Sequence, residues 1–189
     1  MNEPSDKDLV DMFRDDKTRQ QAFRLIVTRY QKKLYWHIRR ILVDHDDTDD
    51  VLQNTFIKTW KGLDGFKEHA QLYTWLYRIA TNETMNFIRQ RKAELFVRYG
   101  DVEHSVADKL QSGDNFSGDE IQKKLQLAIQ QLPEKQRIVF TMKYFEDVKY
   151  EDMSVILETS VGALKASYHH AVKKIEVYIR STSEENIRR

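Results

Sequence analysis

Hydrophobic residues recur every three or four positions along most of the chain, which is the spacing of amphipathic helices. In the first half this pattern predicts a short helix capped by Ser5 and a long helix of about five turns from Ala22 to Ile41. A third helix is predicted to start at Asp47 and a fourth near Leu72. Four helices are therefore expected before the middle of the chain.

The second half shows the same periodicity in shorter segments. One apolar stripe ends at Pro133, and a second covers residues 138–145. A short helix over 150–157, a tight turn at 158–160 and a final helix from Val161 then follow. Two helices joined by so short a turn are typical of a helix-turn-helix, a motif that binds duplex DNA.

The periodicity fails between the two halves. Residues 96–118 combine three glycines with serines and an excess of acidic side chains, and few of these positions are apolar. This composition predicts a flexible acidic linker. The chain is therefore expected to form a domain over 1–95 and a second domain over 119–189, each large enough to fold by itself.

Composition narrows the fold and function classes. Among 189 residues there are only 6 Gly and 2 Pro, too few for the turns of a β-sandwich, and the fold class is predicted to be all-α. The chain has no Cys, which excludes disulfides, thiolate metal sites and cysteine nucleophiles. We find neither a membrane span nor a signal peptide in the sequence, and we expect a cytoplasmic protein without membrane contact of its own.

Charge is distributed in blocks although the net charge is only +1. Residues 21–40 carry six Lys and Arg and no acid, whereas residues 44–50 contain five Asp. Alternating blocks of this kind indicate that different surfaces bind different partners.

The final helix carries a candidate DNA-binding face. If its apolar stripe faces the domain core, the opposite face is small and basic near the N-terminus, which suits the major groove. The alternative is an ordinary solvated helix. Metal binding by the two adjacent histidines is disfavoured because adjacent residues diverge on a helix. The candidate residues are Ser160, Gly162, Lys165, Ala166, His169, His170 and Lys173.

The fourth helix combines aromatic rings with amides and cations. Trp75, Arg78, Asn82, Asn86 and Arg89 recur at three- and four-residue steps and share one edge, and Tyr73 and Tyr77 share another. Rings that stack on bases beside cations that follow the backbone suit single-stranded nucleic acid. The alternative is that the rings complete a core and the cations only solubilise the helix.

The acidic run at 44–50 has several interpretations. A calcium loop is disfavoured because the glycine at the bend and the closing Glu are absent. The carboxylates could balance a helix dipole or form a protein-docking surface. Paired catalytic carboxylates are disfavoured because no other catalytic constellation accompanies them. We therefore expect a protein that is not an enzyme and has no cofactor or metal.

Taken together, these features resemble an extracytoplasmic-function (ECF) sigma factor, a compact class of bacterial transcription initiation factors of the sigma-70 family. Sigma region 2 would cover about 20–92 and sigma region 4 about 120–180. Four segments in the family's order carry the resemblance: Asp47–Trp60, Tyr73–Asn82, Leu132–Arg137 and Ser160–Ser167.

The resemblance implies partners and roles. Such a factor binds the RNA polymerase core through its β′ and β subunits, directs it to promoter DNA, and is commonly restrained by an anti-sigma factor. The helix over 47–60 would dock on β′ through Asp47, Asp50, Gln53 and Asn54. The loop over 65–72 and the fourth helix would capture a flipped base of the −10 motif. The residues implied for that step are Phe66, Tyr73, Trp75, Tyr77, Arg78, Asn82, Asn86 and Arg89.

The final helix would read the −35 motif as duplex, although the sequence departs from the family at several positions. Asn54 stands where many relatives have an acid, and Lys165 and His170 stand where relatives often have arginines. The −35 sequence therefore cannot be inferred from relatives. The rival interpretation is a stand-alone helix-turn-helix regulator with residues 1–95 as a sensor, which would leave the acidic helix and the aromatic–basic helix unexplained.

Overall fold

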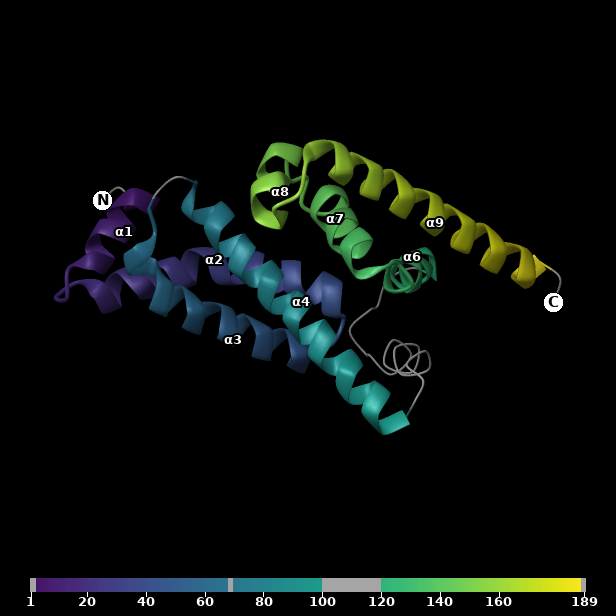
Figure 1. Ribbon diagram of the computed structural model, residues 1–189, viewed down its shortest axis with the longest axis horizontal. Helices are drawn as coiled ribbons and strands as arrows, with labels where there is room; N and C mark the ends of the chain where they lie inside the picture. Colours follow the sequence, from purple (N-terminus) through teal and green to yellow (C-terminus); the bar gives the residue numbers. More distant parts are fainter. Residues whose placement is uncertain (1–2, 68–69, 100–119, 188–189) are drawn as a thin grey trace. The chain divides into compact units, whose positions relative to one another are not determined.

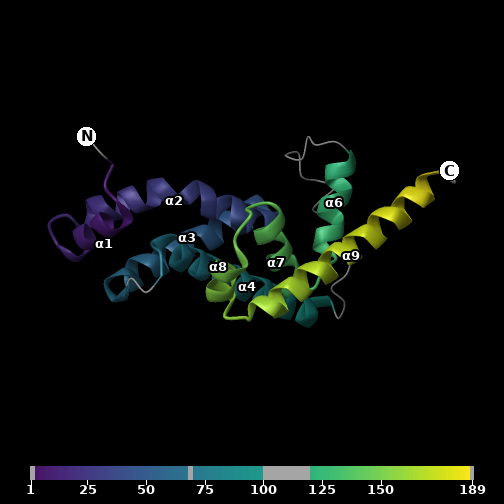
Figure 2. The same ribbon diagram turned by 90° about the horizontal axis from the view of Figure 1, so that it is seen from above.

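The computed structural model describes residues 3–67, 70–99 and 120–187, and every regular element in these ranges is helical. The all-α prediction is therefore confirmed for the part of the chain that the structure describes (Figures 1 and 2). The elements are α1 (Asp6–Arg14), α2 (Arg19–Leu42), α3 (His45–Gly62), the 3-10 turn η1 (Leu63–Gly65), α4 (Leu72–Tyr99), α6 (Glu120–Gln130), α7 (Glu134–Tyr144), α8 (Tyr150–Leu157) and α9 (Val161–Ile187).

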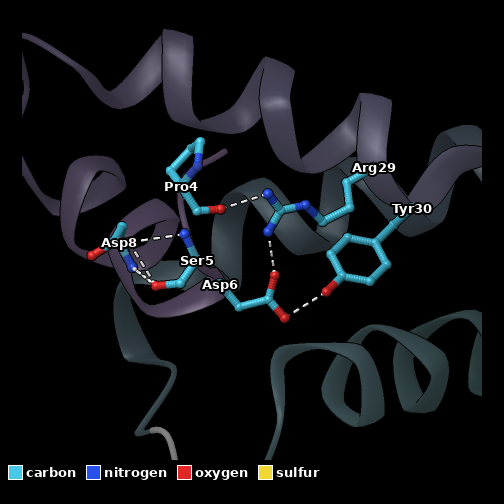
Figure 3. A network of polar contacts seen from close by, with 6 residues as sticks. All are labelled: Pro4, Ser5, Asp6, Asp8, Arg29 and Tyr30. Carbon is cyan, nitrogen blue, oxygen red and sulfur yellow. Dashed lines mark hydrogen bonds and ion pairs between the residues drawn. The ribbon is translucent and has the colours of Figure 1, made fainter. Parts of the chain in front are cut away.

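Helix α1 begins as the sequence predicts, with Ser5 as its N-cap. The Ser5 hydroxyl accepts a hydrogen bond from the Asp8 amide at 3.2 Å, and the Asp8 carboxylate accepts one from the Ser5 amide at 2.8 Å (Figure 3). The hydrogen bonds from the Ser5 side chain and backbone lower the pKa of Asp8. This reciprocal capping box satisfies two backbone donors that a helix start would otherwise leave unpaired.

A polar network ties α1 to α2. The Asp6 carboxylate accepts hydrogen bonds from Arg29 Nη1 at 2.7 Å and from the Tyr30 hydroxyl at 2.5 Å. The second guanidinium nitrogen of Arg29 donates to the Pro4 carbonyl at 2.6 Å (Figure 3). Burial, and then the Asp6 carboxylate, raise the pKa of Tyr30 above its usual range, so the phenol remains a donor at neutral pH.

The core of the first unit lies between α1, α2, α3 and α4. Its largest fully buried apolar side chains are Leu9, Phe13, Ile26, Leu34, Ile38, Ile41, Leu63 and Leu76. Aromatic rings close one end: Phe13, Phe23 and Trp60 meet with ring centroids 4.9–6.1 Å apart. The apolar periodicity of the sequence predicted most of these positions.

Several threonines are fully buried in α3 and α4. Thr55 and Thr59 in α3, and Thr81 and Thr84 in α4, each donate a hydroxyl hydrogen bond of 2.7–2.8 Å to the carbonyl four residues earlier. No hydroxyl donor of these four is left unsatisfied, so the side chains act as small core residues. Ion pairing between Lys58 Nζ and Glu83, at 2.5 Å, links α3 to α4 on the outer side.

The second unit is built around α9. Helices α6, α7 and α8 all pack against α9, and the core contains Ala128, Ile129, Leu132, Phe140, Ala171 and Ile175. Between α8 and α9 the chain turns at Glu158, which has a left-handed backbone (φ 50°) and whose amide donates to the Ser154 carbonyl. The predicted helix-turn-helix is therefore confirmed.

The chain divides into two compact units, Met1–Asn86 and Phe87–Arg189, and the boundary falls inside α4. Helix α4 continues to Tyr99, so residues 96–99 of the predicted linker are helical. From Leu72 onward the sequence contains neither glycine nor proline before Gly100, so no helix-breaking residue ends α4 earlier. The rest of the predicted linker, 100–118, lies outside the described residues. Across the described ranges, none of the helices has the length and apolarity that a bilayer crossing requires.

The turn between α6 and α7 depends on Arg137. Its Nη2 donates to the Gln130 carbonyl at 2.7 Å and lies 3.4 Å from the Leu132 carbonyl, both at the end of α6. The guanidinium is largely desolvated, which lowers the pKa of Arg137, although it stays protonated. The cation therefore caps carbonyls that the helix end leaves without partners.

We expect Arg137→Met to destabilise the second unit by about 2 kcal/mol, because hydrogen bonds to a charged donor contribute about 1.5–3 kcal/mol when buried. The measurement is the free energy of unfolding in denaturant. Exposed Lys135 provides the matched control, and Lys135→Met should change this free energy by less than about 0.5 kcal/mol. Equal effects of the two substitutions would contradict the capping role.

Candidate protein and nucleic-acid interfaces

Helix α3 starts two residues earlier than predicted. The helix begins at His45, and Asp44 is its N-cap, with Oδ1 accepting from the Asp47 amide at 3.1 Å. The prediction that Asp47 starts the helix is therefore wrong, because the pattern of apolar residues marks a helix face and not its cap. Asp47 is half-buried in the first turn, where a carboxylate stabilises the helix dipole.

The remaining predicted docking residues lie on one exposed face. Asp50, Gln53 and Asn54 are exposed, and Ile57 continues the same row with 45% of its surface exposed. The opposite face of α3 is buried through Val51 and the threonines. The result is a row of acidic and amide side chains beside one aliphatic residue, and its charge complements a basic surface on a protein partner.

The acidic run contains a contact between a histidine and a carboxylate. His45 Nδ1 lies 3.1 Å from the Asp49 carboxylate. Nowhere in the described ranges do three His, Cys, Asp or Glu side chains converge in a way that could hold a metal ion.

The loop before α4 is held by aromatic packing. The ring of Phe66, only 7% exposed, lies 5.3 Å from the Trp75 indole. Gly62 lets that indole approach the end of α3, since a Cβ at Gly62 would lie 3.3 Å from the ring. Phe66 and Trp75, both predicted −10 site residues, therefore hold the loop in place by packing against each other. Residues 68–69 of the loop lie outside the described residues.

The predicted base-contacting tyrosines differ in exposure. Tyr77 is only 3% exposed, with its ring 4.9 Å from His37 and its hydroxyl 3.5 Å from the Lys33 carbonyl of α2. Tyr73 is half-buried and lies 4.2 Å from Tyr77. In this conformation Tyr77 supports Tyr73, and only Tyr73 offers ring surface to a ligand.

The polar residues predicted for the −10 site form a row of their own on α4, apart from Tyr73 and Tyr77. Asn82, Asn86 and Arg89 are exposed along α4, and Arg78 is half-buried above them. One step around the helix, Thr81 donates to the Tyr77 carbonyl at 2.7 Å and lies 2.9 Å from His37 Nε2. Because the hydroxyl spends its only proton on that carbonyl, His37 Nε2 is the donor in this contact. Helix α4 is thus fixed to α2 on one side and polar on the other.

Sequence reasoning missed two arginines that hold the loop. Arg14, at the end of α1, donates from Nη2 to the Phe66 carbonyl at 2.9 Å. Arg19, at the start of α2, pairs with Asp64 of η1 at 2.8 Å. These contacts join residues about 45–52 positions apart in sequence. Nothing in a single sequence distinguishes such arginines from solvated ones.

Helix α9 exposes the face that was predicted to bind DNA. Ser160 is the N-cap, since its hydroxyl accepts from the Ala163 amide at 3.3 Å. The candidate residues on α9 are all exposed, whereas Leu164 and Ala171 are buried. A Cβ added at Gly162 would meet no atom within 4 Å, so open space lies over the first turn. The exposed candidates are Gly162, Lys165, Ala166, His169, His170 and Lys173.

Tyr150 orients a lysine of this face, a role that the sequence did not indicate. Lys165 Nζ lies 5.7 Å from the Tyr150 ring centroid, and Lys143 Nζ lies 5.6 Å from the same centroid. Lys143 is also held by Asp147 at 2.6 Å, a contact that raises the pKa of Lys143 and lowers that of Asp147. Two ammonium groups over one ring place positive charge beside the start of α9.

Both halves of the chain match known protein families. Residues 26–94 match sigma-70 region 2, and residues 122–175 match sigma-70 region 4. These ranges contain every predicted docking and DNA-contact residue described above, whereas Arg14 and Arg19, which hold the loop, lie outside them.

Similar proteins match over most of their length. RNA polymerase sigma-H factor of Pseudomonas aeruginosa is 32% identical over 185 residues, which cover 93% of this chain and 94% of that protein. The ECF RNA polymerase sigma factor SigW of Bacillus subtilis is 32% identical over 172 residues, covering 85% and 90%. The ECF sigma-E factor of Escherichia coli K12 is 30% identical over 173 residues, covering 86% and 89%.

Solved structures share the fold. The sigma factor RpoE, determined in complex with the anti-sigma factor NepR from Bartonella quintana, has a TM-score of 0.69 at 23% identity, covering 84% of this chain and 96% of that one. CnrH, determined in complex with the cytosolic domain of CnrY, has a TM-score of 0.68 at 21% identity, covering 93% and 97%.

Proposed function

Because this chain belongs to the ECF sigma factors of the sigma-70 family, which bind RNA polymerase and give it promoter specificity, we propose that its two units contact promoter DNA in different states. The first unit binds the melted −10 motif as a single strand, and the second binds the −35 motif as duplex. The protein acts in this way by binding and not by catalysis.

The contrast between the two exposed faces carries this proposal. Along α4, the amides of Asn82 and Asn86 and the cation of Arg89 form one exposed row, and the half-buried ring of Tyr73 lies on another side of the helix. Amides can hydrogen-bond to base edges that are accessible only after the duplex opens, and a ring can stack on such a base. A flipped base would therefore bind against Tyr73, with the buried ring of Tyr77 packed behind it.

The start of α9 has a different chemistry. Gly162 and Ala166 leave the helix narrow, and Lys165 stands over Tyr150 at its flank. A narrow helix with a capped N-terminus fits the major groove of intact duplex, where lysine and histidine can reach guanine edges or phosphates. His169, His170 and Lys173 continue this face by two further turns.

The proposal extends to protein partners. The row Asp50, Gln53, Asn54 and Ile57 on α3 would dock on the β′ subunit of the polymerase core, and the second unit would approach the β subunit. Two similar folds were determined in complexes with an anti-sigma factor and with the cytosolic domain of CnrY, which supports regulation of this chain by an anti-sigma factor in the cytoplasm.

Charge reversal tests the docking surface. We expect Asp50→Lys to weaken association with core polymerase by about 2 kcal/mol, or about thirtyfold, because a carboxylate at the interface becomes a repelled cation. Association is measured by titration of core polymerase with labelled protein. Asp16→Lys, at a side chain that is 97% exposed between α1 and α2, is the matched control and should bind normally. Normal binding of Asp50→Lys would exclude this face from the interface.

Single substitutions also separate the two DNA contacts. Asn82→Ala should impair open-complex formation, and a promoter with a pre-melted bubble should not rescue it, since base capture itself is lost. Lys165→Ala should weaken duplex binding by about 1–3 kcal/mol if it reads a base edge. If Lys165 contacts a phosphate instead, the salt slope falls by about one.

Footprinting of the holoenzyme measures both effects. Protection should be lost near −10 with Asn82→Ala and near −35 with Lys165→Ala. Lys174→Ala, on the opposite side of α9 from Lys165, should leave both halves of the footprint protected. Loss of the same half of the footprint by both substitutions would refute the proposed division.

A further inference from the structure

Helix α2 carries a concentration of positive charge that the functions above do not use. Its 24 residues contain seven Lys and Arg and no Asp or Glu. Within the first unit, Arg19 pairs with Asp64 and Arg29 with Asp6. Lys32 and Lys33 are exposed.

An exposed tryptophan lies among these cations. Trp36 has 47% of its surface exposed and follows Lys32 and Lys33 at four- and three-residue steps. Arg40, one turn further on, places its guanidinium 6.0 Å from the Trp36 ring centroid. Tyr35 meets the indole edge-on at 5.5 Å, which limits its rotation. Cations and an open ring therefore alternate along one side of α2.

This side of α2 borders the helix that we propose binds the melted −10 strand. His37, the residue after Trp36, lies 2.9 Å from Thr81 of α4, and the Lys33 carbonyl lies 3.5 Å from the Tyr77 hydroxyl. Successive residues on a helix are about 100° apart, so the indole stands on the flank next to this contact. Tyr73 lies 4.2 Å from Tyr77 on this side of α4, so a strand that stacks on Tyr73 would lie close to Lys33 and Trp36.

We infer that Lys32, Lys33, Trp36 and Arg40, the basic–aromatic face of α2, form a second binding site for single-stranded promoter DNA. One base stacks on the Trp36 indole, and the cations follow the phosphates on either side. The inference rests on the proposed function of α4 and extends its binding site onto a second helix.

The chemistry favours a single strand over other partners. Duplex DNA needs only the cations, because its bases are already stacked and offer no face to an indole. An acidic protein surface would pair with the cations and would have no specific use for the indole. A single strand uses both features, and binding of this kind combines stacking with strong salt dependence.

The test uses the holoenzyme and a promoter from which it initiates, prepared as a full duplex and as a fork with a single-stranded −10 overhang. Trp36→Leu should weaken binding to the fork by about fivefold or more, and Trp36→Phe should retain most of the affinity because a ring remains. Lys33→Gln should reduce the slope of log affinity against log salt by about 0.7, the value for one phosphate contact on a single strand.

Arg24→Gln is the matched control, since Arg24 is exposed on the opposite side of α2 from Lys33. This substitution should change neither the affinity for the fork nor the salt slope. Wild-type affinity of Trp36→Leu for the fork, or equal weakening on fork and duplex, would overturn the inference. So would loss of holoenzyme assembly, because the face would then contact polymerase. If Asn82→Ala weakens fork binding and Trp36→Leu does not, only this inference fails. If neither does, the proposed function of α4 fails as well.

Discussion

The contact between α2 and α4 is the constraint on which the first unit depends. Helix α4 is held in place on one side, yet its outer edge stays polar. The buried contact of His37 with Thr81, and of Tyr77 with His37 and the Lys33 carbonyl, holds the helix with polar groups that satisfy one another. Because this seam uses one side of α4, the edge with Asn82, Asn86 and Arg89 remains exposed.

Helix α9 solves the corresponding problem in the second unit. Leu164, Ala171 and Ile175 anchor it in the core, while Lys165, His169 and other polar side chains stand outward. The N-terminal turn is set by the Ser160 cap and by the left-handed residue Glu158. Tyr150 of α8 then orients Lys165, so the first helix of the motif helps to prepare the face of the second.

The sequence predicts the helices, the helix-turn-helix, the Ser5 cap and the exposure of the candidate DNA-binding face of α9. It does not separate Tyr73 from Tyr77, because tyrosine suits both a core boundary and a binding surface, and only packing against His37 decides. The arginines that hold the loop were not predictable either. Arg14 and Arg19 contact residues about 45–52 positions away, and a single sequence contains no signal of such pairs. The exact end of α4, at Tyr99, was not predictable from composition, because polar composition does not end a helix that lacks a glycine or proline.

Transcription in vitro tests the central claim, that one chain binds an upstream duplex element and a melted downstream element while bound to polymerase. Core polymerase is incubated with genomic DNA with and without the chain, and transcript 5′ ends are mapped. The account predicts new start sites that share two sequence elements, near −35 and −10, at a nearly constant separation. Start sites that do not change, together with tight binding of the chain alone to duplex DNA, would contradict it and favour a stand-alone regulator.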